Sequence, residues 1–194
     1  MKQILFFLLF SISIYSSEVL IYGDPMTDYI TFVDEAFLDS LPGEKSGSAP
    51  VNLFTFNRLI QNYTTKCTGG SAVNTLKGLA SLGHSCTVIG RIGEDEEGLN
   101  LMQSLLSRGI SHHYTACSPS TGKVVCMISP DGHRTMRSHT IDIIPFTTTP
   151  SMFEGVKLFH IEGYQIFNPP FLKSLISQAK QAGALVSMDV GCFE

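Results

Sequence analysis

Residues 71–109 predict a helix, a buried strand and a second helix, an order that leaves few possible folds. The first helix, residues 71–82, carries apolar side chains at helical spacing and ends at Gly83, a helix stop. The short apolar run "CTVIG", residues 86–90, has the length of a buried strand. Acidic residues fill the first turn of the helix over 94–109, where they interact favourably with the helix dipole. Helix–strand–helix order is typical of parallel β/α units, so we expect an α/β fold with a mainly parallel sheet and flanking helices.

Other segments extend this pattern or depart from it. The runs "EVLIYGDP", "VKLFHIEGY" and "ALVSMDV" each predict a strand, and "PPFLKSLISQAKQAG" predicts a helix with proline in its first turn. Residues 53–63 have helical spacing, and residues 42–52 are a polar, Gly/Pro/Ser-rich loop. Residues 121–139 differ, because their alternation around the turn Pro130-Asp131-Gly132-His133 predicts a β-hairpin. With a strand at 29–33, this hairpin is expected to form a small sheet beside the main fold.

Composition narrows the class of protein. The chain of 194 residues is 43% hydrophobic, which fits one domain with a substantial core. A net charge of −4 and scattered Lys and Arg residues argue against nucleic acid as the main partner. Five cysteines without a C-x-x-C pair predict reduced, mostly buried thiols, not a disulfide framework or zinc site. The pair His112-His113 predicts a solvated turn and no metal site.

The N-terminal residues 1–17 form a hydrophobic leader that has the shape of a signal peptide. Its apolar run is too short to span a bilayer comfortably. The possible cleavage sites are poor, because Ile14 and Tyr15 stand three residues before each cut. A hydrophobic extension or a wrongly chosen start codon are the alternatives. We expect a cytoplasmic protein, with export as the alternative if the leader is removed.

A first candidate site follows the strand that begins the chain's α/β region. Asp28 is expected just past that strand, and open α/β sheets bind ligands beyond the carboxyl ends of their strands. A carboxylate there can accept two hydroxyl hydrogen bonds from a polyol. A solvated loop aspartate or a turn cap is the alternative.

A second candidate site opens the helix of residues 71–82. Gly69 and Gly70 allow the backbone to approach a ligand closely, and free N–H groups at a helix start favour an oxygen-rich ligand. Asn74, in the first turn, can donate to and accept from a hydroxyl at once. The alternative is an ordinary helix entry with Ser71 as the N-cap.

Several motifs in this order resemble the ribokinase-like family, the PfkB carbohydrate kinases. The signature positions are Gly69-Gly70, Asn74, Gly83 and Gly93. The segment "GRIGEDEEG" resembles the family's strand–turn–helix. Residues 23–28 resemble its first strand and sugar-binding aspartate, and "TGKVVCMISPDGHRT" resembles its lid strand and turn. The resemblance covers the N-terminal half of the family fold and is closest to the adenosine-kinase branch. Leu76 stands where the signature usually has a small residue, and Asp24 where that branch generally has asparagine.

The resemblance implies ATP-dependent phosphorylation of a hydroxyl on a small-molecule sugar or nucleoside, with ATP and Mg²⁺ as cofactors. Asp28, Gly69, Gly70 and Asn74 would hold the acceptor's hydroxyls beside Ser71. Tyr164 would pack on the sugar or base, with a core tyrosine as the alternative. Residues 18–194 would be the N-terminal portion of a PfkB-type kinase domain, a Rossmann-like ribokinase fold with a small β lid. Lid segments at about 28–50 and 112–142 would exclude water during transfer.

The family's Gly-rich anion hole and aspartate general base lie in a C-terminal half, and no G-A-G-D motif occurs in this sequence. No catalytic residue and no metal ligand is therefore assigned. We therefore expect this chain to be the acceptor-binding half of a kinase, without detectable phosphotransfer activity of its own. Its partner would be a chain supplying the other half, or a second copy through the lid. The alternative is a non-catalytic sugar- or nucleoside-binding or regulatory module. A Rossmann dehydrogenase is less favoured, because this sequence lacks the dinucleotide-binding fingerprint.

Overall fold

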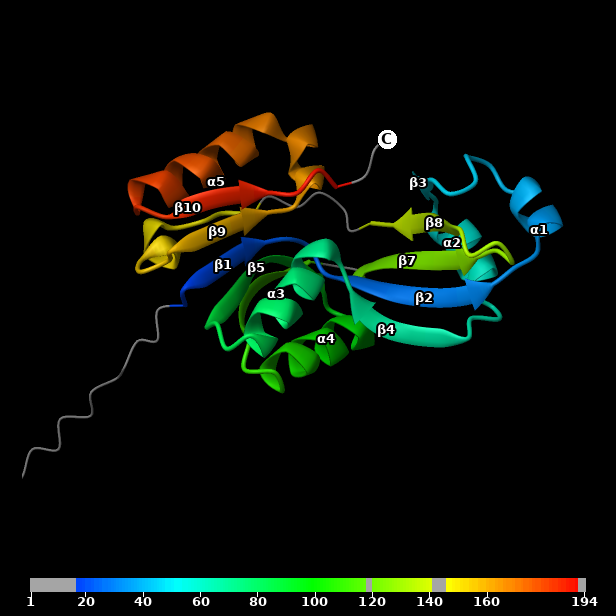
Figure 1. Cartoon of the computed structure of the whole chain (residues 1–194), viewed down its shortest axis with the longest axis horizontal. Helices are drawn as coiled ribbons and strands as arrows, with labels where there is room; N and C mark the ends of the chain where they lie inside the picture. The colour runs from blue at the N-terminus through cyan, green and yellow to red at the C-terminus, as the bar shows by residue number, and fades with distance from the viewer. Residues whose placement is uncertain (1–16, 118–119, 141–145, 192–194) are drawn as a thin grey trace, which may run out of the picture.

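The computed structural model describes residues 17–117, 120–140 and 146–191, so the expected leader lies outside it except for Ser17. The chain forms two five-stranded sheets that lie end to end (Figure 1). In the first sheet the strand order is β10-β9-β1-β5-β6 and every pairing is parallel. Its strands are β1 (Val19–Tyr22), β5 (Cys86–Gly93), β6 (Ser111–Cys117), β9 (Leu158–Ile161) and β10 (Leu185–Met188). This confirms the predicted α/β class with a parallel main sheet.

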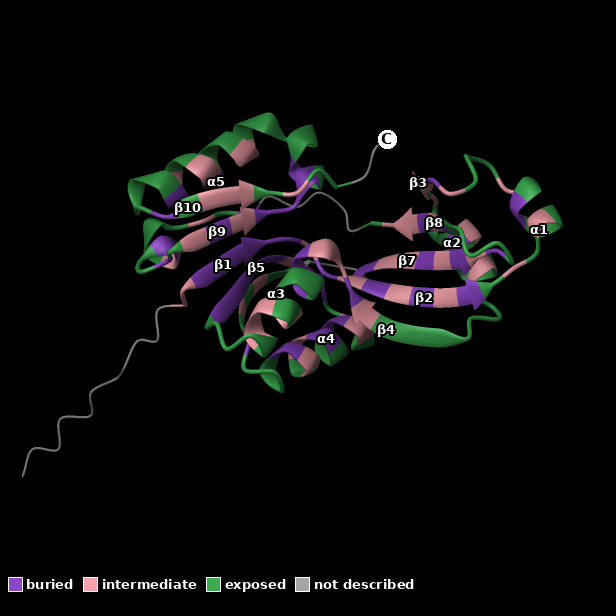
Figure 2. Cartoon of the chain, viewed as in Figure 1, coloured by how far each residue is buried: buried purple, intermediate pink, exposed green. Residues whose placement is uncertain are grey.

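Helices cover both faces of the first sheet, as Figure 1 shows. Two lie on one face, α3 (Ser71–Ser81) and α4 (Glu96–Leu106); the other face carries α5 (Pro169–Gln181) and the 3₁₀ turn η1 (Pro150–Phe153). Successive β1 residues alternate between the two cores, with Ile21 against α3 and Leu20 against α5. Strands covered on both sides are apolar throughout, so β1 and most of β5 are buried (Figure 2).

The second sheet has the order β3-β8-β7-β2-β4. Its strands are β2 (Met26–Phe32), β3 (Ser48–Pro50), β4 (Thr65–Gly69), β7 (Gly122–Ile128) and β8 (Arg134–His139). The predicted hairpin is confirmed, because β7 and β8 pair antiparallel around Gly132. One face packs on α1 (Glu35–Asp39) and α2 (Leu53–Leu59) through a cluster of Tyr29, Leu38, Phe56, Val125 and Met127.

The chain crosses between the two sheets at short connections. Only residues 23–25 separate β1 from β2, and Gly70 alone separates β4 from α3. These crossings therefore bring the carboxyl ends of the first sheet against the second sheet, and the functional site lies at this junction.

Three strands, β3, β4 and β6, were missed because they lie at sheet edges. Strand β3 falls within residues 42–52, which were predicted to be a loop. The β4 residues are mostly polar and exposed, so they carry no apolar alternation. The pair His112-His113 lies on edge strand β6, so the predicted solvated turn is wrong. The two segments expected to form a lid do not coincide with one sheet: residues 112–117 belong to the first sheet, whereas β4, outside both segments, belongs to the second. Residues 141–142 lie outside the described ranges, and the lid role stays a prediction.

Two smaller expectations also change. The three cysteines with described side chains are free thiols, but Cys67 is exposed, whereas Cys86 is buried and Cys126 half-buried. The helix expected over residues 71–82 ends at Ser81, and Leu82 is 77% exposed, so its buried face is formed by Ala72, Val73 and Leu76. Gly83 has φ +89°, which confirms the predicted left-handed helix stop. Within the described ranges, no helix has the length and apolar character needed to cross a membrane.

Candidate functional site

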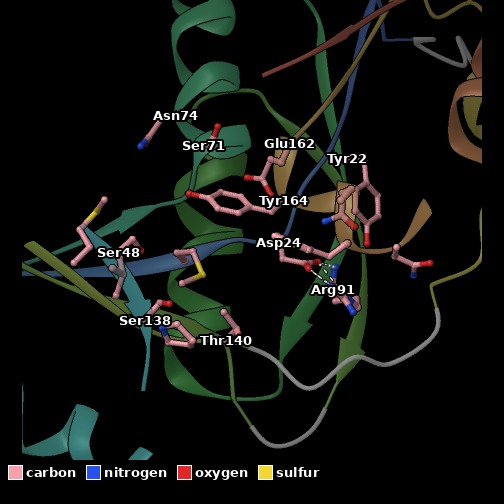
Figure 3. Close-up of a pocket in the computed structure, with 18 of the residues that line it drawn as sticks. Tyr22, Asp24, Ser48, Ser71, Asn74, Arg91, Ser138, Thr140, Glu162 and Tyr164 are labelled. Carbon is pink, nitrogen blue, oxygen red and sulfur yellow. Dashed lines mark hydrogen bonds and ion pairs between the residues drawn. The ribbon is translucent and has the colours of Figure 1, made fainter. Parts of the chain in front are cut away.

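A cavity of about 930 Å³ lies at the junction of the two sheets, a size suited to a small-molecule ligand (Figure 3). Asp28 and Asn74, which are 46 positions apart in sequence, line the same cavity. Gly70, Ser71 and Tyr164 line it as well, and Gly69 stands directly behind Asp28. The structure thus brings together all six residues that were singled out in the sequence.

Asp28 lies within strand β2, opposite Cys67 of β4, and not in a loop after β1 as expected. The Asp28 carboxylate accepts no hydrogen bond from the described residues, so both of its oxygens can meet ligand hydroxyls. A Cβ on Gly69 would lie 2.2 Å from Asp28 Oδ2, so only glycine leaves room for this carboxylate. Burial raises the pKa of Asp28, and the nearby Lys77 ammonium partly lowers it. The side chain is thus a half-buried acceptor at the cavity wall.

Gly70 shapes the start of α3. It has φ +100° and occupies the N-cap position without a side-chain cap, so the alternative of Ser71 as the N-cap is wrong. Ser71 instead donates its hydroxyl to Asp189 Oδ2 over 2.6 Å. The backbone N–H of Ala72 donates to Glu162 Oε1 over 2.8 Å, so this N–H group is already paired with a protein carboxyl.

Asn74 and Tyr164 approach the cavity from two different elements. Asn74 is exposed on the first turn of α3, at the edge of the cavity. Tyr164 comes from the 3₁₀ turn η2 (Gly163–Phe167) and its ring extends across the cavity in Figure 3. Because Tyr164 is 45% exposed, the alternative of a core tyrosine is wrong.

Glu162 is a site residue that sequence reasoning missed. It lines the cavity directly after β9 and is only 5% exposed. Burial, together with the nearby carboxylates of Asp24 and Asp189, raises the pKa of Glu162 to about 8 in spite of the hydrogen bond from Ala72. The available signal was its position, because "HIEG" places a carboxyl just past an apolar strand, as expected for Asp28.

Glu162 should make stability depend on pH. Its carboxyl titrates near 4.5 in the unfolded chain and near 8 in the fold, so between these values only the folded state keeps the proton. Its stabilising contribution is complete below about pH 4.5 and is lost as pH rises through 8. We expect Glu162→Gln to gain stability relative to the wild type over this range. Urea unfolding of both proteins from pH 5 to 9 measures the difference, and parallel curves would contradict the assignment.

Asp24 and Arg91 form a second unpredicted feature. Arg91, on β5, donates its backbone N–H to Asp24 Oδ1 over 2.9 Å and its Nε to both carboxylate oxygens over 3.1–3.2 Å. The Arg91 Nη2 contacts Asp24 Oδ2 as well. This ion pair joins the ends of the adjacent strands β1 and β5 at the cavity.

The remaining cavity wall is largely apolar and aromatic. The rings of Tyr22, Phe146 and Phe171 meet edge-to-face, with centroids 5.0–6.4 Å apart. Exposed Phe167 and the side chains of Met26 and Met136 add to this wall. The cavity therefore offers both carboxyl and amide groups and aromatic surface to one ligand.

The Mg²⁺ expected from the resemblance finds no ligand set here. Among the described residues, no group of three or more His, Cys, Asp or Glu side chains could hold a metal ion. No metal ligand is therefore assigned among the described residues.

Comparisons with known proteins agree with this geometry. The chain resembles adenosine kinase from Sinorhizobium meliloti with TM-score 0.79 and 22% identity, covering 89% of this chain and 56% of that one. A probable sugar kinase from Rhizobium etli gives TM-score 0.78 and 23% identity, covering 89% and 56%. Adenosine kinase from Schistosoma mansoni in complex with adenosine gives TM-score 0.78 and 17% identity, covering 90% of this chain and 55% of that one. At these identities the matches establish a shared fold.

Sequence comparison identifies the family. Probable fructokinase-6, chloroplastic, of Arabidopsis thaliana is 27% identical over 134 residues, which are 64% of this chain and 35% of that protein. The chain thus spans little more than half of the structural relatives and about a third of this one. Residues 49–190 match the family described as pfkB family carbohydrate kinase. Since this match covers most of the chain, the protein belongs to the pfkB family of carbohydrate kinases.

Proposed function

We propose that this chain binds the acceptor in ATP-dependent phosphotransfer to a hydroxyl of a sugar or nucleoside. The observation that carries this proposal is the shared cavity of Asp28 and Asn74, because a carboxylate and an amide facing one space can hold several hydroxyls. Gly69 and Gly70 support it by keeping the backbone close to that space. Substrate binding by Ser71 and Tyr164, and closure of the second sheet as a lid, belong to the same proposal.

The aromatic wall favours a nucleoside over a simple sugar. Tyr22, Phe146 and Phe171 offer more apolar ring surface than a small polyol can cover, whereas a nucleobase can pack against it. The three structural relatives named above include both kinds of kinase: two are adenosine kinases and one is a probable sugar kinase. A non-catalytic sugar- or nucleoside-binding or regulatory module would use the same cavity, and the distinction is catalytic turnover.

Ligand-observed NMR with adenosine, fructose and ribose tests the proposal. We expect saturable binding of adenosine by the isolated chain, and weaker binding of the two sugars. With ATP and Mg²⁺ added, we expect no phosphorylated product above a protein-free blank, because no general base or anion hole is assigned in this chain. Absence of binding by all three compounds contradicts acceptor binding. Phosphorylated product formed by the isolated chain would contradict both the proposal that it only binds the acceptor and the alternative of a non-catalytic module.

The proposed partner is a chain that supplies the remaining part of a kinase fold. β10 is an edge strand, and exposed Leu185, Met188 and Val190 lie on it or directly after it. A homodimer through the lid is less favoured, because α1 and α2 already cover one face of the second sheet. A cytoplasmic location remains the proposal for this protein, and N-terminal sequencing of native material tests the alternative of export.

A further inference from the structure

The Asp24–Arg91 ion pair has a consequence for ligand charge. Both side chains line the cavity, yet they are only 18% and 12% exposed, so the pair is largely shielded from water. The Arg91 side chain contacts Asp24 through both Nε and Nη2, and the Arg91 backbone N–H binds the same carboxylate. A guanidinium in such a fork-like contact with a carboxylate is held in place and neutralised.

The formal charges around the cavity are unbalanced. Among the described lining residues, Arg91 is the single Lys, Arg or His side chain, whereas Asp24, Asp28 and Glu162 provide three carboxyl groups. A phosphate monoester would bring a charge of about −1.5 to −2 into this space. It would meet the Asp28 carboxylate without a cation of its own, since Arg91 is already paired. Glu162 adds no negative charge at neutral pH, because its pKa of about 8 leaves the carboxyl largely protonated.

We propose that the Asp24–Arg91 ion pair sets the acceptor class, so that the cavity accepts uncharged hydroxyl compounds and rejects phosphorylated ones. This inference rests on the proposed function, because it concerns the acceptor of that same site. Asp24 acts here as a specificity-determining residue, because it pairs with the one cationic side chain that the described lining residues offer to a phosphate. Like-charge contacts in a shielded site disfavour the wrong ligand more than they strengthen the right one.

A purely structural role for the ion pair makes a different prediction. If the pair only joined β1 to β5, its loss would weaken binding of all ligands alike or lower the stability of the fold. A specificity role instead changes the ratio of affinities for phosphorylated and unphosphorylated ligands. The ratio therefore separates the two roles.

The test uses the full chain with fructose and adenosine as neutral probes, and fructose 1-phosphate and fructose 6-phosphate as anionic ones. We expect the wild type to bind a neutral probe and neither phosphate. Asp24→Asn, which releases the Arg91 guanidinium, should raise affinity for at least one phosphate about tenfold or more relative to fructose. The double variant Asp24→Asn/Arg91→Gln should lose this gain, because the released cation is gone.

A matched control variant shows whether a change in the affinity ratio is specific to Asp24, and the possible outcomes distinguish failure of this inference from failure of the proposed function. Asp131→Asn removes a carboxylate from the Lys45 ion pair, outside the residues that line the cavity, and should leave the ratio unchanged. An unchanged ratio in Asp24→Asn, or a gain that persists in the double variant, overturns the inference alone. If Asp24→Asn does not fold, the wild type decides: a fructose phosphate bound as tightly as fructose overturns it. Failure of the wild type to bind any neutral probe overturns the proposed function and this inference together.

Discussion

Asp28→Ala should lower affinity for a hydroxyl-bearing ligand such as adenosine by about 100-fold or more, because hydrogen bonds to a charged group contribute about 1.5–3 kcal/mol each. The carboxylate receives no hydrogen bond from the described residues, and Gly69 leaves it room at the cavity wall. Removing it therefore deprives the ligand of its charged acceptor. Titration of adenosine against wild type and variant measures the change in Kd.

The stability of the same variant provides a second readout. Burial raises the pKa of Asp28, so the ionised side chain costs folding free energy at neutral pH. We expect Asp28→Ala to have a melting temperature equal to or above that of the wild type. Asp39→Ala, on the exposed surface of α1, is the matched control and should change neither Kd nor melting temperature. An affinity within twofold of wild type would remove Asp28 from the binding site.

Gly93→Ala should destabilise the fold by about 3 kcal/mol, the upper part of the usual range for an overpacked site. A Cβ at Gly93 would lie 2.0 Å from the Thr121 backbone N and 2.2 Å from the Ser120 carbonyl carbon. These are backbone atoms, and Thr121 is fixed by two hydrogen bonds to Asp95, the N-cap of α4, so it cannot move away easily. Urea denaturation measures the loss of unfolding free energy.

Gly78→Ala is the matched control, because it adds the same methyl group where no neighbour lies within 4 Å. Gly78 is in the interior of α3 and is exposed, so alanine should keep or increase stability, by up to about 1 kcal/mol. The two glycine substitutions should therefore have opposite signs. A Gly93→Ala protein as stable as Gly78→Ala would show that the close approach to Thr121 is not needed for folding.

The elements with strong local patterns were predicted from the sequence. Residues only a few positions apart decide three of these elements: the helix that begins after Gly70, its left-handed stop at Gly83 and the hairpin around Gly132. The family resemblance added the expectation that Asp28 and Asn74 serve one site, and both line the same cavity. Their role in binding stays a prediction.

The elements that were missed lack a local signal. Strands β4 and β6 lie at sheet edges, where polar residues such as those at 65–68 are exposed and show no apolar period. Glu162 and the Asp24–Arg91 pair were missed for a different reason. Their partners, Ala72 for Glu162 and Arg91 for Asp24, are 90 and 67 positions away in sequence.

The sequence by itself determined the α/β class, the main helices and the paired glycines before the helix of residues 71–82. Hydrophobic periodicity and backbone preference act over a few residues, so they can be read without the fold. Only the tertiary structure decided the charge of the cavity, because charge there depends on which carboxyls are buried and which cation is paired. Burial and pairing arise when β1, β5, β9 and α3 pack together, and no local stretch of sequence contains that arrangement.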